Sequence, residues 1–331
     1  MRRFLIGFAV TVVCLGLLVR LIDWERTRSV LSSADPAFIA LAVTCLLLSL
    51  VAKTVRWKLL LPDEPGVSTS RLYRILHVSF LLNNVLPARL GDVARVAMTT
   101  RQPGVRFGHV LSSMLTERVT DFITLLACFV AVSPFLPFPR QYRTELHIAW
   151  FTLGGLAVAG IVVLALRHRL FEVIRMLPVP GWFQSSRISA EATSFRQGLR
   201  QLFSRRHVLP IWGWSWGAWL GAFAINYLLM LALDIHAPIT VAVLLTCTTN
   251  LAMLVPSSPG YLGVFHAAAT LTLLPFNVGA SAAFSFAILA HLVNVLPVSI
   301  IGAAILLAGR ESVSLNLRGA RAEEPISDEA A

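Results

Sequence analysis

Six ionisable residues fall in two stretches of the chain whose neighbours are mostly apolar. They are Arg89, Asp92, Arg95, Glu117, Arg118 and Asp121. Glu117 and Asp121 are four residues apart, so they share one helix face, which is able to bind Arg89 or Arg95. The spacing of three between Asp92 and Arg95, and between Arg118 and Asp121, also brings opposite charges together. Three arginines balance three carboxylates, which favours a network of ion pairs.

The chemistry open to this cluster depends on whether all of its charges pair with one another. A guanidinium donates two parallel hydrogen bonds to a phosphate, so an arginine with spare donors is a phosphate ligand. A carboxylate with spare acceptors is a general base for a transfer reaction. A closed network does neither and only fixes the helices that carry it. These three interpretations are all open at this point.

The composition places the cluster in a membrane. The chain has 331 residues, of which 56% are hydrophobic and 14% are charged, and the apolar residues form blocks of about twenty, the length that crosses a bilayer. This predicts an all-α polytopic membrane protein. Six full spans are expected, at residues 4–22, 37–61, 110–133, 147–166, 208–233 and 281–308.

Charge and cysteine usage exclude several other classes. The net charge is +11, but the basic residues lie between apolar blocks, where they favour contact with anionic lipid and not with nucleic acid. The four cysteines lie far apart inside apolar blocks, and no histidine stands at metal-ligand spacing. We therefore expect no disulfide, no metal and no cofactor.

Two further apolar stretches, 75–97 and 239–275, are interrupted by residues that break helices. The first contains Asn83, Asn84, Pro87 and Gly91, and the second contains Pro256, Pro259, Gly260 and Gly263. A break at membrane depth survives only inside protein or beside water, so both stretches are predicted to be re-entrant helical hairpins. Paired breaks also favour an inverted repeat with a binding site near the middle of the bilayer.

The distribution of Lys and Arg predicts the orientation. With both hairpins returning to the side they came from, the positive-inside rule places both termini in the cytoplasm of a bacterium, with the protein in its inner membrane. The hairpins then enter from opposite faces. The loop 167–207 is predicted to contain a basic amphipathic helix on the anionic inner leaflet, and residues 311–331 a disordered tail. His266 and His291 are candidate titrating residues within the apolar region.

Several motifs in order resemble one family. The run 82–95 has the form N-x-x-P-x-R-x-G-D-x-x-R, residues 116–121 contain E-R-x-x-D, and residues 256–265 have the form P-x-x-P-G-Y-x-G-x-F. Together these are similar to the transmembrane family of lysylphosphatidylglycerol synthase, whose members are also described as flippase-like. Tyr261 stands where the family often has a second glycine, and His291 where an arginine is expected.

The resemblance implies a lipid transporter whose substrate has an anionic phosphate headgroup. It implies that Arg89, Arg95 and Arg118 bind the phosphate, while Asp92, Glu117 and Asp121 hold these arginines. The soluble aminoacyl-transfer domain of some relatives is not found in this sequence, so lysyl-lipid synthesis by this chain alone is not expected. Two alternatives remain. One is a membrane-embedded glycosyltransferase that uses a lipid-linked sugar, and the other is a membrane subunit that docks a separate soluble synthase.

Overall fold

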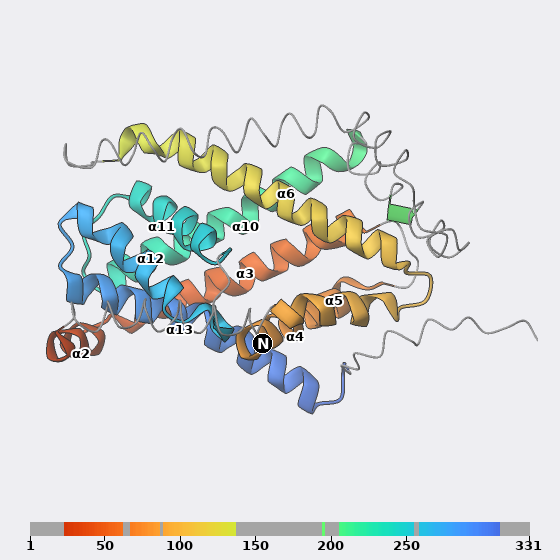
Figure 1. Ribbon diagram of the computed structural model, residues 1–331, viewed down its shortest axis with the longest axis horizontal. Coiled ribbons are helices and arrows are strands. Elements are labelled where there is room, and N and C mark those ends of the chain that lie inside the picture. The colour runs from red at the N-terminus through yellow and green to blue at the C-terminus, as the bar shows by residue number, and fades with distance from the viewer. Residues whose placement is uncertain are drawn as a thin grey trace, which may run out of the picture.

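The computed structural model of the protein describes residues 23–61, 67–86, 89–136, 194–195, 205–254 and 258–311. Every regular element within these ranges is a helix (Figure 1). Four of these helices are long and apolar enough to cross a membrane: α3 (Pro36–Leu60), α6 (Phe107–Val132), α10 (Arg205–Ala232) and α13 (Ala280–Leu307). They lie within a few residues of four of the predicted spans, which confirms the all-α polytopic membrane fold. The predicted spans 4–22 and 147–166, and most of the loop 167–207, lie outside the described residues.

The long helices begin and pack as their sequences dictate. Asp35 caps α3 by accepting a hydrogen bond from the amide of Ala37 at 2.8 Å, and Pro36 occupies the first helical position. Along α3 lies α10, where Gly221 has no side chain and leaves room for Ser49; a Cβ at Gly221 would overlap the hydroxyl of Ser49. Small residues allow such close contact between helices in a membrane.

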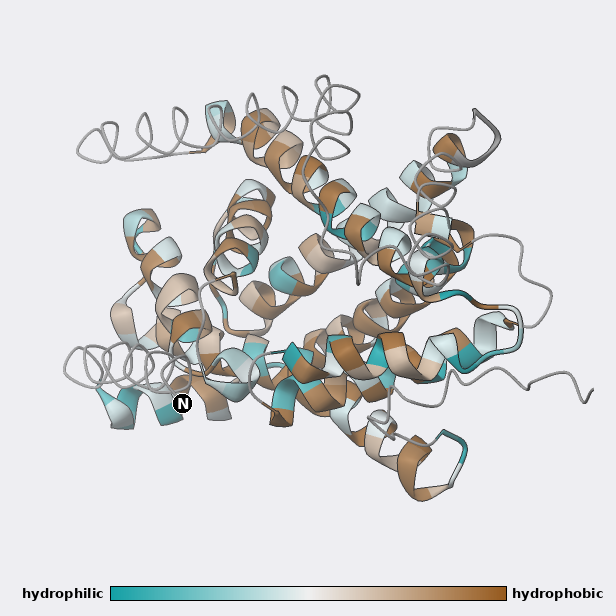
Figure 2. Ribbon diagram, turned by 45° about the vertical axis from the view of Figure 1, so that its right-hand side comes forward, coloured by the Kyte–Doolittle hydropathy of each residue, from teal (hydrophilic) through white to brown (hydrophobic). Residues whose placement is uncertain are grey.

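Helix α6 has an apolar stripe on its exposed side and carries polar residues on its buried side. Phe107, Leu111, Leu115, Val119 and Ile123 recur every four residues, and each is at least 36% exposed. Figure 2 shows that apolar residues make up most of the long helices, with hydrophilic residues interrupting them. A bilayer favours this arrangement, because lipid solvates the apolar stripe while protein surrounds the polar one. The polar face of α6 carries the ionisable residues predicted to form the site.

Both interrupted stretches are pairs of short helices. The first pair is α4 (Thr69–Val85) and α5 (Leu90–Thr100), and the second is α11 (Ile239–Ala252) and α12 (Val264–Leu273), with the 3-10 turn η5 (Pro259–Tyr261) before α12. Figure 1 shows α4 and α5 toward one end of the long axis and α11 and α12 toward the other. The two breaks are in contact, since α4 packs against η5. The inverted repeat stays a prediction.

Three shorter features complete the fold. Helix α2 (Trp24–Ser32), which the sequence did not predict, lies against α13, where the ring of Trp24 meets that of Phe284 edge-on. The 3-10 turns η2 (Ser133–Phe135) and η6 (Leu274–Phe276) extend α6 and α12. At the end of α13, Glu311 is buried and forms ion pairs with Arg71 and Arg74 of α4 at 3.4 and 3.2 Å. The described residues therefore include the first residue of the predicted tail, and residues 312–331 lie outside them.

Candidate functional site

Glu117, near the middle of α6, accepts both hydrogen bonds of a guanidinium fork. Nη2 of Arg95 lies 2.8 Å from Oε2 of Glu117, and Nη1 lies 3.3 Å from Oε1. Arg95 is 3% exposed, and its guanidinium carbon lies 3.7 Å from the ring centre of Trp57. Charge, hydrogen bonding and stacking all hold this side chain in place. Of the two arginines that the sequence offered to this helix face, Arg89 and Arg95, it is Arg95 that pairs with Glu117, and the pair joins α5 to α6.

A second arginine in this network, Arg56, was not singled out from the sequence, although it lies in the predicted span 37–61. Its side chain is fully buried, and its Nη1 donates to Asp121 at 2.6 Å and to Ser215 at 3.2 Å. Its Nη2 lies 3.8 Å from Oε1 of Glu117. The indole N–H of Trp219 also donates to Asp121, at 3.2 Å. Arg56 therefore ties α3 to α6 and α10.

The third ion pair, Arg118 with Asp92, is the most open. Nη2 of Arg118 lies 3.4 Å from Oδ2 of Asp92, and the Arg118 side chain is 49% exposed. Asn83 donates its amide to Oδ1 of Asp92 at 3.1 Å and accepts the backbone N–H of Asp92 at 3.2 Å, which closes the first hairpin. The charges thus pair between helices. The sequence spacing had suggested pairs within one helix, Asp92 with Arg95 and Arg118 with Asp121.

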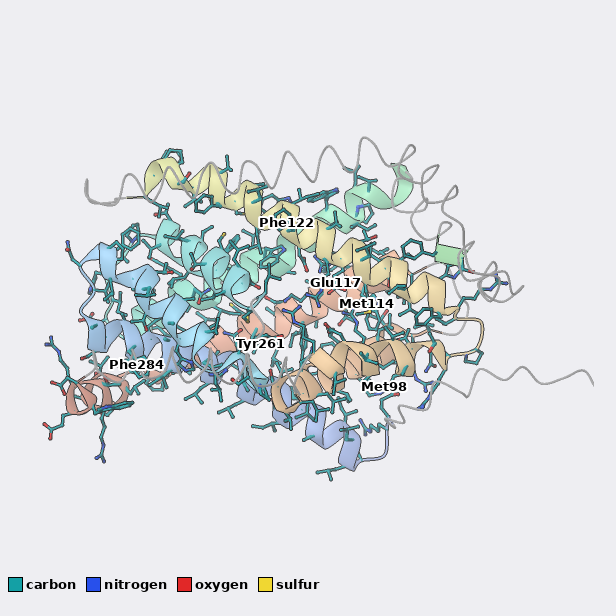
Figure 3. The ribbon with its side chains drawn as sticks, in the orientation of Figure 1. Met98, Met114, Glu117, Phe122, Tyr261 and Phe284 are labelled. Atoms are coloured by element: carbon teal, nitrogen blue, oxygen red, sulfur yellow. The ribbon has the colours of Figure 1, made fainter. Side chains whose placement is uncertain are left out.

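The two breaks meet through Arg89 and Tyr261. Arg89 donates to the backbone carbonyl of Met253 at 3.1 Å, and its guanidinium carbon lies 5.6 Å from the ring centre of Tyr261. Both residues have a left-handed backbone, with φ of 55° and 58°. Such backbone strain in residues other than glycine concentrates at functional sites. Figure 3 labels Tyr261 and Glu117 in the central part of the molecule.

The remaining predicted residues of the breaks have structural contacts. Asn84 donates to the hydroxyl of Ser299 on α13 at 3.0 Å. Gly91 lies in the first turn of α5, where a Cβ would overlap the carbonyl oxygen of Ser79. Gly260 has φ of 68°, and a Cβ there would lie 3.2 Å from the carbonyl oxygen of Asn84. Pro259 begins η5 and Gly263 precedes α12 with φ of 82°, while Pro256 lies outside the described residues.

His266 and His291 form a pair beside the second break. Their ring centres are 4.8 Å apart, and Nε2 of His291 lies 2.9 Å from the carbonyl oxygen of Gly260. The rings of Phe265 and Phe284 pack around the pair. The structure thus brings the two histidines together in an apolar setting. Across the described ranges, no group of three or more His, Cys, Asp or Glu side chains stands in a position to hold a metal.

One more cation, Lys53, belongs to the charged core and was not singled out from the sequence. Its ammonium lies 5.9 Å from the ring centre of Trp219, within electrostatic range of Asp121 and Arg118. With Lys53 and Arg56 included, the described core contains five basic side chains and three carboxylates. The members are Lys53, Arg56, Arg89, Arg95, Arg118, Asp92, Glu117 and Asp121. The described core therefore holds two more basic than acidic side chains, whereas the sequence had suggested equal numbers.

Comparison with known proteins is consistent with this architecture. The sequence matches the family model described as the lysylphosphatidylglycerol synthase TM region over residues 4–302. The chain belongs to this family. It is 25% identical over 328 residues to glycosyltransferase AglD of Haloferax volcanii, covering 87% of this chain and 51% of AglD. It is 23% identical over 225 residues to UPF0104 membrane protein MJ1078 of Methanocaldococcus jannaschii, covering 67% of this chain and 91% of MJ1078.

The similarity to AglD covers most of this chain but only part of AglD. The chain spans about half the length of AglD, so half of AglD lies outside the similar region. No solved structure matches the chain. The comparisons therefore show the membrane family of the chain.

Proposed function

We propose that the protein binds the phosphate headgroup of a membrane lipid in its charged core and moves that lipid between leaflets. The observation that carries the proposal is the exposure of the Arg118 side chain. Arg118 lies near the middle of the span α6, is 49% exposed, and forms one ion pair with the described part of the chain, at 3.4 Å. An exposed guanidinium at that depth needs water or an anion as a partner. A lipid phosphate supplies the anion in the geometry that arginine prefers.

The proposal divides the arginines into two groups. Arg56 and Arg95 are buried, form ion pairs with carboxylates and hold the helices of the bundle together. Arg118 and Arg89 contact the headgroup, and Asp92 and Asn83 fix the position of Arg118 between transport events. The resemblance implied that Arg89, Arg95 and Arg118 all bind the headgroup; in this proposal Arg89 and Arg118 keep that role and Arg95 does not. The two hairpins enter the bacterial inner membrane from opposite faces, and their contact closes the path through the core.

Glycosyl transfer is the second candidate, because AglD is named a glycosyltransferase. Such a reaction needs a carboxylate that is available as a base. Here Glu117 and Asp121 are bound by Arg95 and Arg56, and Asp92 by Arg118 and Asn83. The engaged carboxylates favour transport over transfer. Release of a glycosylated product from a lipid-phosphate sugar by the purified chain would reverse this preference.

The test is leaflet translocation of labelled phospholipids in proteoliposomes. We expect Arg118→Ala to slow movement by roughly tenfold or more, because a charge-assisted bond to the headgroup is lost. Arg310→Ala is the matched control, since Arg310 is exposed at the end of α13 and outside the core. Normal transport by a well-inserted Arg118→Ala protein would contradict the role of Arg118.

The absence of any lipid movement by folded wild-type protein would favour two other roles. One is the transferase. The other is a subunit that contacts the anionic leaflet through the loop 167–207 and docks a soluble synthase there. Co-purification of a synthase that is lost when this loop is replaced would support the docking role.

A further inference from the structure

A guanidinium crosses from the first break to the second. Arg89 is the residue before α5 in the first hairpin, and its Nη2 donates to the carbonyl oxygen of Met253 in the second hairpin, at 3.1 Å. Met253 follows directly on α11, at the end where the last carbonyls of a helix have no partner within it. That end also carries a partial negative charge, which attracts a cation. Arg89 therefore caps the C-terminus of α11 from the opposite hairpin.

Backbone strain accompanies this contact. Arg89 and Tyr261 both have positive φ, and the guanidinium carbon of Arg89 lies 5.6 Å from the ring centre of Tyr261. A left-handed backbone in residues other than glycine persists where the surrounding contacts enforce it. The breaks also approach closely at Gly260, where a Cβ would lie 3.2 Å from the carbonyl oxygen of Asn84. Separation of the two breaks would relieve this strain.

A phosphate changes the balance of interactions at Arg89. The carbonyl group of Met253 is neutral, whereas a phosphate oxygen is charged, and hydrogen bonds to an ionised acceptor are roughly twice as strong. The negative end of α11 also repels a phosphate. Arg89 therefore binds a phosphate best after it has left Met253. A ligand shifts an equilibrium between two forms toward the form that it binds more tightly.

We propose that Arg89 is a latch, a contact that holds the two hairpins together until the phosphate of a lipid headgroup breaks it. This inference rests on the proposed headgroup site and names the contact that its ligand opens. In the closed form Arg89 caps α11 beside the ring of Tyr261. When a phosphate binds, the guanidinium turns to it, the cap is lost and the two breaks separate. Binding of the headgroup thereby opens the path that the contact between the breaks closes.

The distance between two spin labels in the full chain tests the latch. The labels are attached to Val85→Cys at the end of α4 and Leu254→Cys after α11, both exposed positions, in a background without native cysteines. In nanodiscs of phosphatidylcholine we expect one short distance. Added phosphatidylglycerol should populate a longer distance as its dose rises, whereas added phosphatidylcholine should not. This series needs no variant of Arg89 that folds.

A count of bound lipid by native mass spectrometry separates the latch from the proposed function. An unchanged distance in protein that binds phosphatidylglycerol would overturn the latch and leave the headgroup site intact. No binding of phosphatidylglycerol would refute the headgroup site itself, and the latch with it. Millimolar inorganic phosphate is added in a separate series. A distance that stays short there supports the lipid as the ligand, and a long distance would overturn the lipid and assign the latch to a soluble phosphate.

Removal of the latch should open the breaks without a ligand. In phosphatidylcholine alone, Arg89→Gln is expected to show the longer distance, and phosphatidylglycerol should add little to it. Arg310→Gln is the matched control, because Arg310 is exposed at the end of α13. A short distance in folded Arg89→Gln would show that other contacts hold the breaks together and would overturn the latch.

A weaker latch should bind lipid more tightly, which damage to the site would not cause. Linkage requires that a change favouring the open form also strengthens binding of the ligand that selects this form. Tyr261→Leu removes the aromatic face and keeps Arg89, so we expect phosphatidylglycerol to bind severalfold more tightly. Tyr261→Phe retains the ring and should bind as the wild type does. Weaker or unchanged binding by folded Tyr261→Leu would overturn the latch.

Discussion

An arginine inside a bilayer is stabilised when its charge is paired, and the core pairs its two buried arginines in different ways. Arg95 binds one carboxylate with both arms of its fork and stacks on Trp57. Arg56 bridges Glu117 and Asp121 from α3. Because each carboxylate here stabilises a buried cation, removal of one partner leaves an unpaired charge in an apolar setting.

Arg56→Met is therefore expected to lower the free energy of unfolding by about 3–5 kcal/mol. Titration with a denaturing detergent in mixed micelles measures this change. Adding Asp121→Asn to Arg56→Met should restore part of the loss, since the unpaired carboxylate is also removed. Lys58→Met serves as the control, because Lys58 is an exposed residue of the same helix. A loss below about 1 kcal/mol for Arg56→Met would show that water reaches the pair and that the network contributes little.

Tyr261 has a left-handed backbone at a position where the resemblance had implied glycine. Glycine adopts positive φ without strain, whereas tyrosine does not. Tyrosine accepts a φ of 58° here and places its ring over Arg89. The sequence alone identified the substitution but not its consequence, because the backbone angle depends on how the two breaks meet.

At the scale of elements, glycines decide how closely the helices approach. Along α10, Gly221 faces Ser49 of α3, whereas Gly213 has no atom within 4 Å of a hypothetical Cβ. Gly302 of α13 likewise permits contact with α4, since a Cβ would lie 2.7 Å from the carbonyl oxygen of His77. These contacts bring α10 against α3, which carries Arg56, and α13 against α4, which carries Asn83.

The pair Gly221→Ala and Gly213→Ala tests this on a single helix. Gly221→Ala is expected to destabilise the protein by about 1–3 kcal/mol, because α3 and α10 have to separate. Gly213→Ala is expected to be neutral or to stabilise by up to about 1 kcal/mol, since alanine favours helix and meets nothing. Thermal unfolding of the detergent-solubilised proteins measures both. Equal effects of the two substitutions would show that the α3–α10 contact does not depend on Gly221.

The sequence predicted the helices and their breaks better than it predicted which charged side chains pair. Twenty-residue apolar blocks and the proline and glycine interruptions are local signals, and they placed four spans and both breaks within a few residues. Arg56 and Lys53 were missed because they stand near the end of an apolar block, where basic residues are usually interfacial. The motif K-x-x-R-W puts Lys53 and Arg56 on one helix face, and that spacing was the available signal. Partner choice between helices needed the three-dimensional arrangement.

At the scale of the whole molecule, the orientation follows from counting spans. Five predicted spans separate α2 from the end of α13 when both hairpins return to the side they came from. An odd number of crossings predicts that Arg26 and Arg310 lie on opposite faces of the membrane. The positive-inside rule then predicts that Arg26 lies outside and Arg310 in the cytoplasm. Pro103, between α5 and α6, is exposed and should be cytoplasmic only if the first hairpin is re-entrant.

Single cysteines at these three positions test the orientation in a background without native cysteines. We expect Arg26→Cys to react with an impermeant maleimide in spheroplasts. Pro103→Cys and Arg310→Cys should react only after the membrane is permeabilised. Labelling of Pro103→Cys from outside would mean that α4 and α5 together cross the membrane. A cytoplasmic Pro103 with an external Arg310 would mean that α11 and α12 do so. In either case the two hairpins would no longer enter the membrane from opposite faces. The transported lipid would then need a path that does not pass the contact between the two breaks.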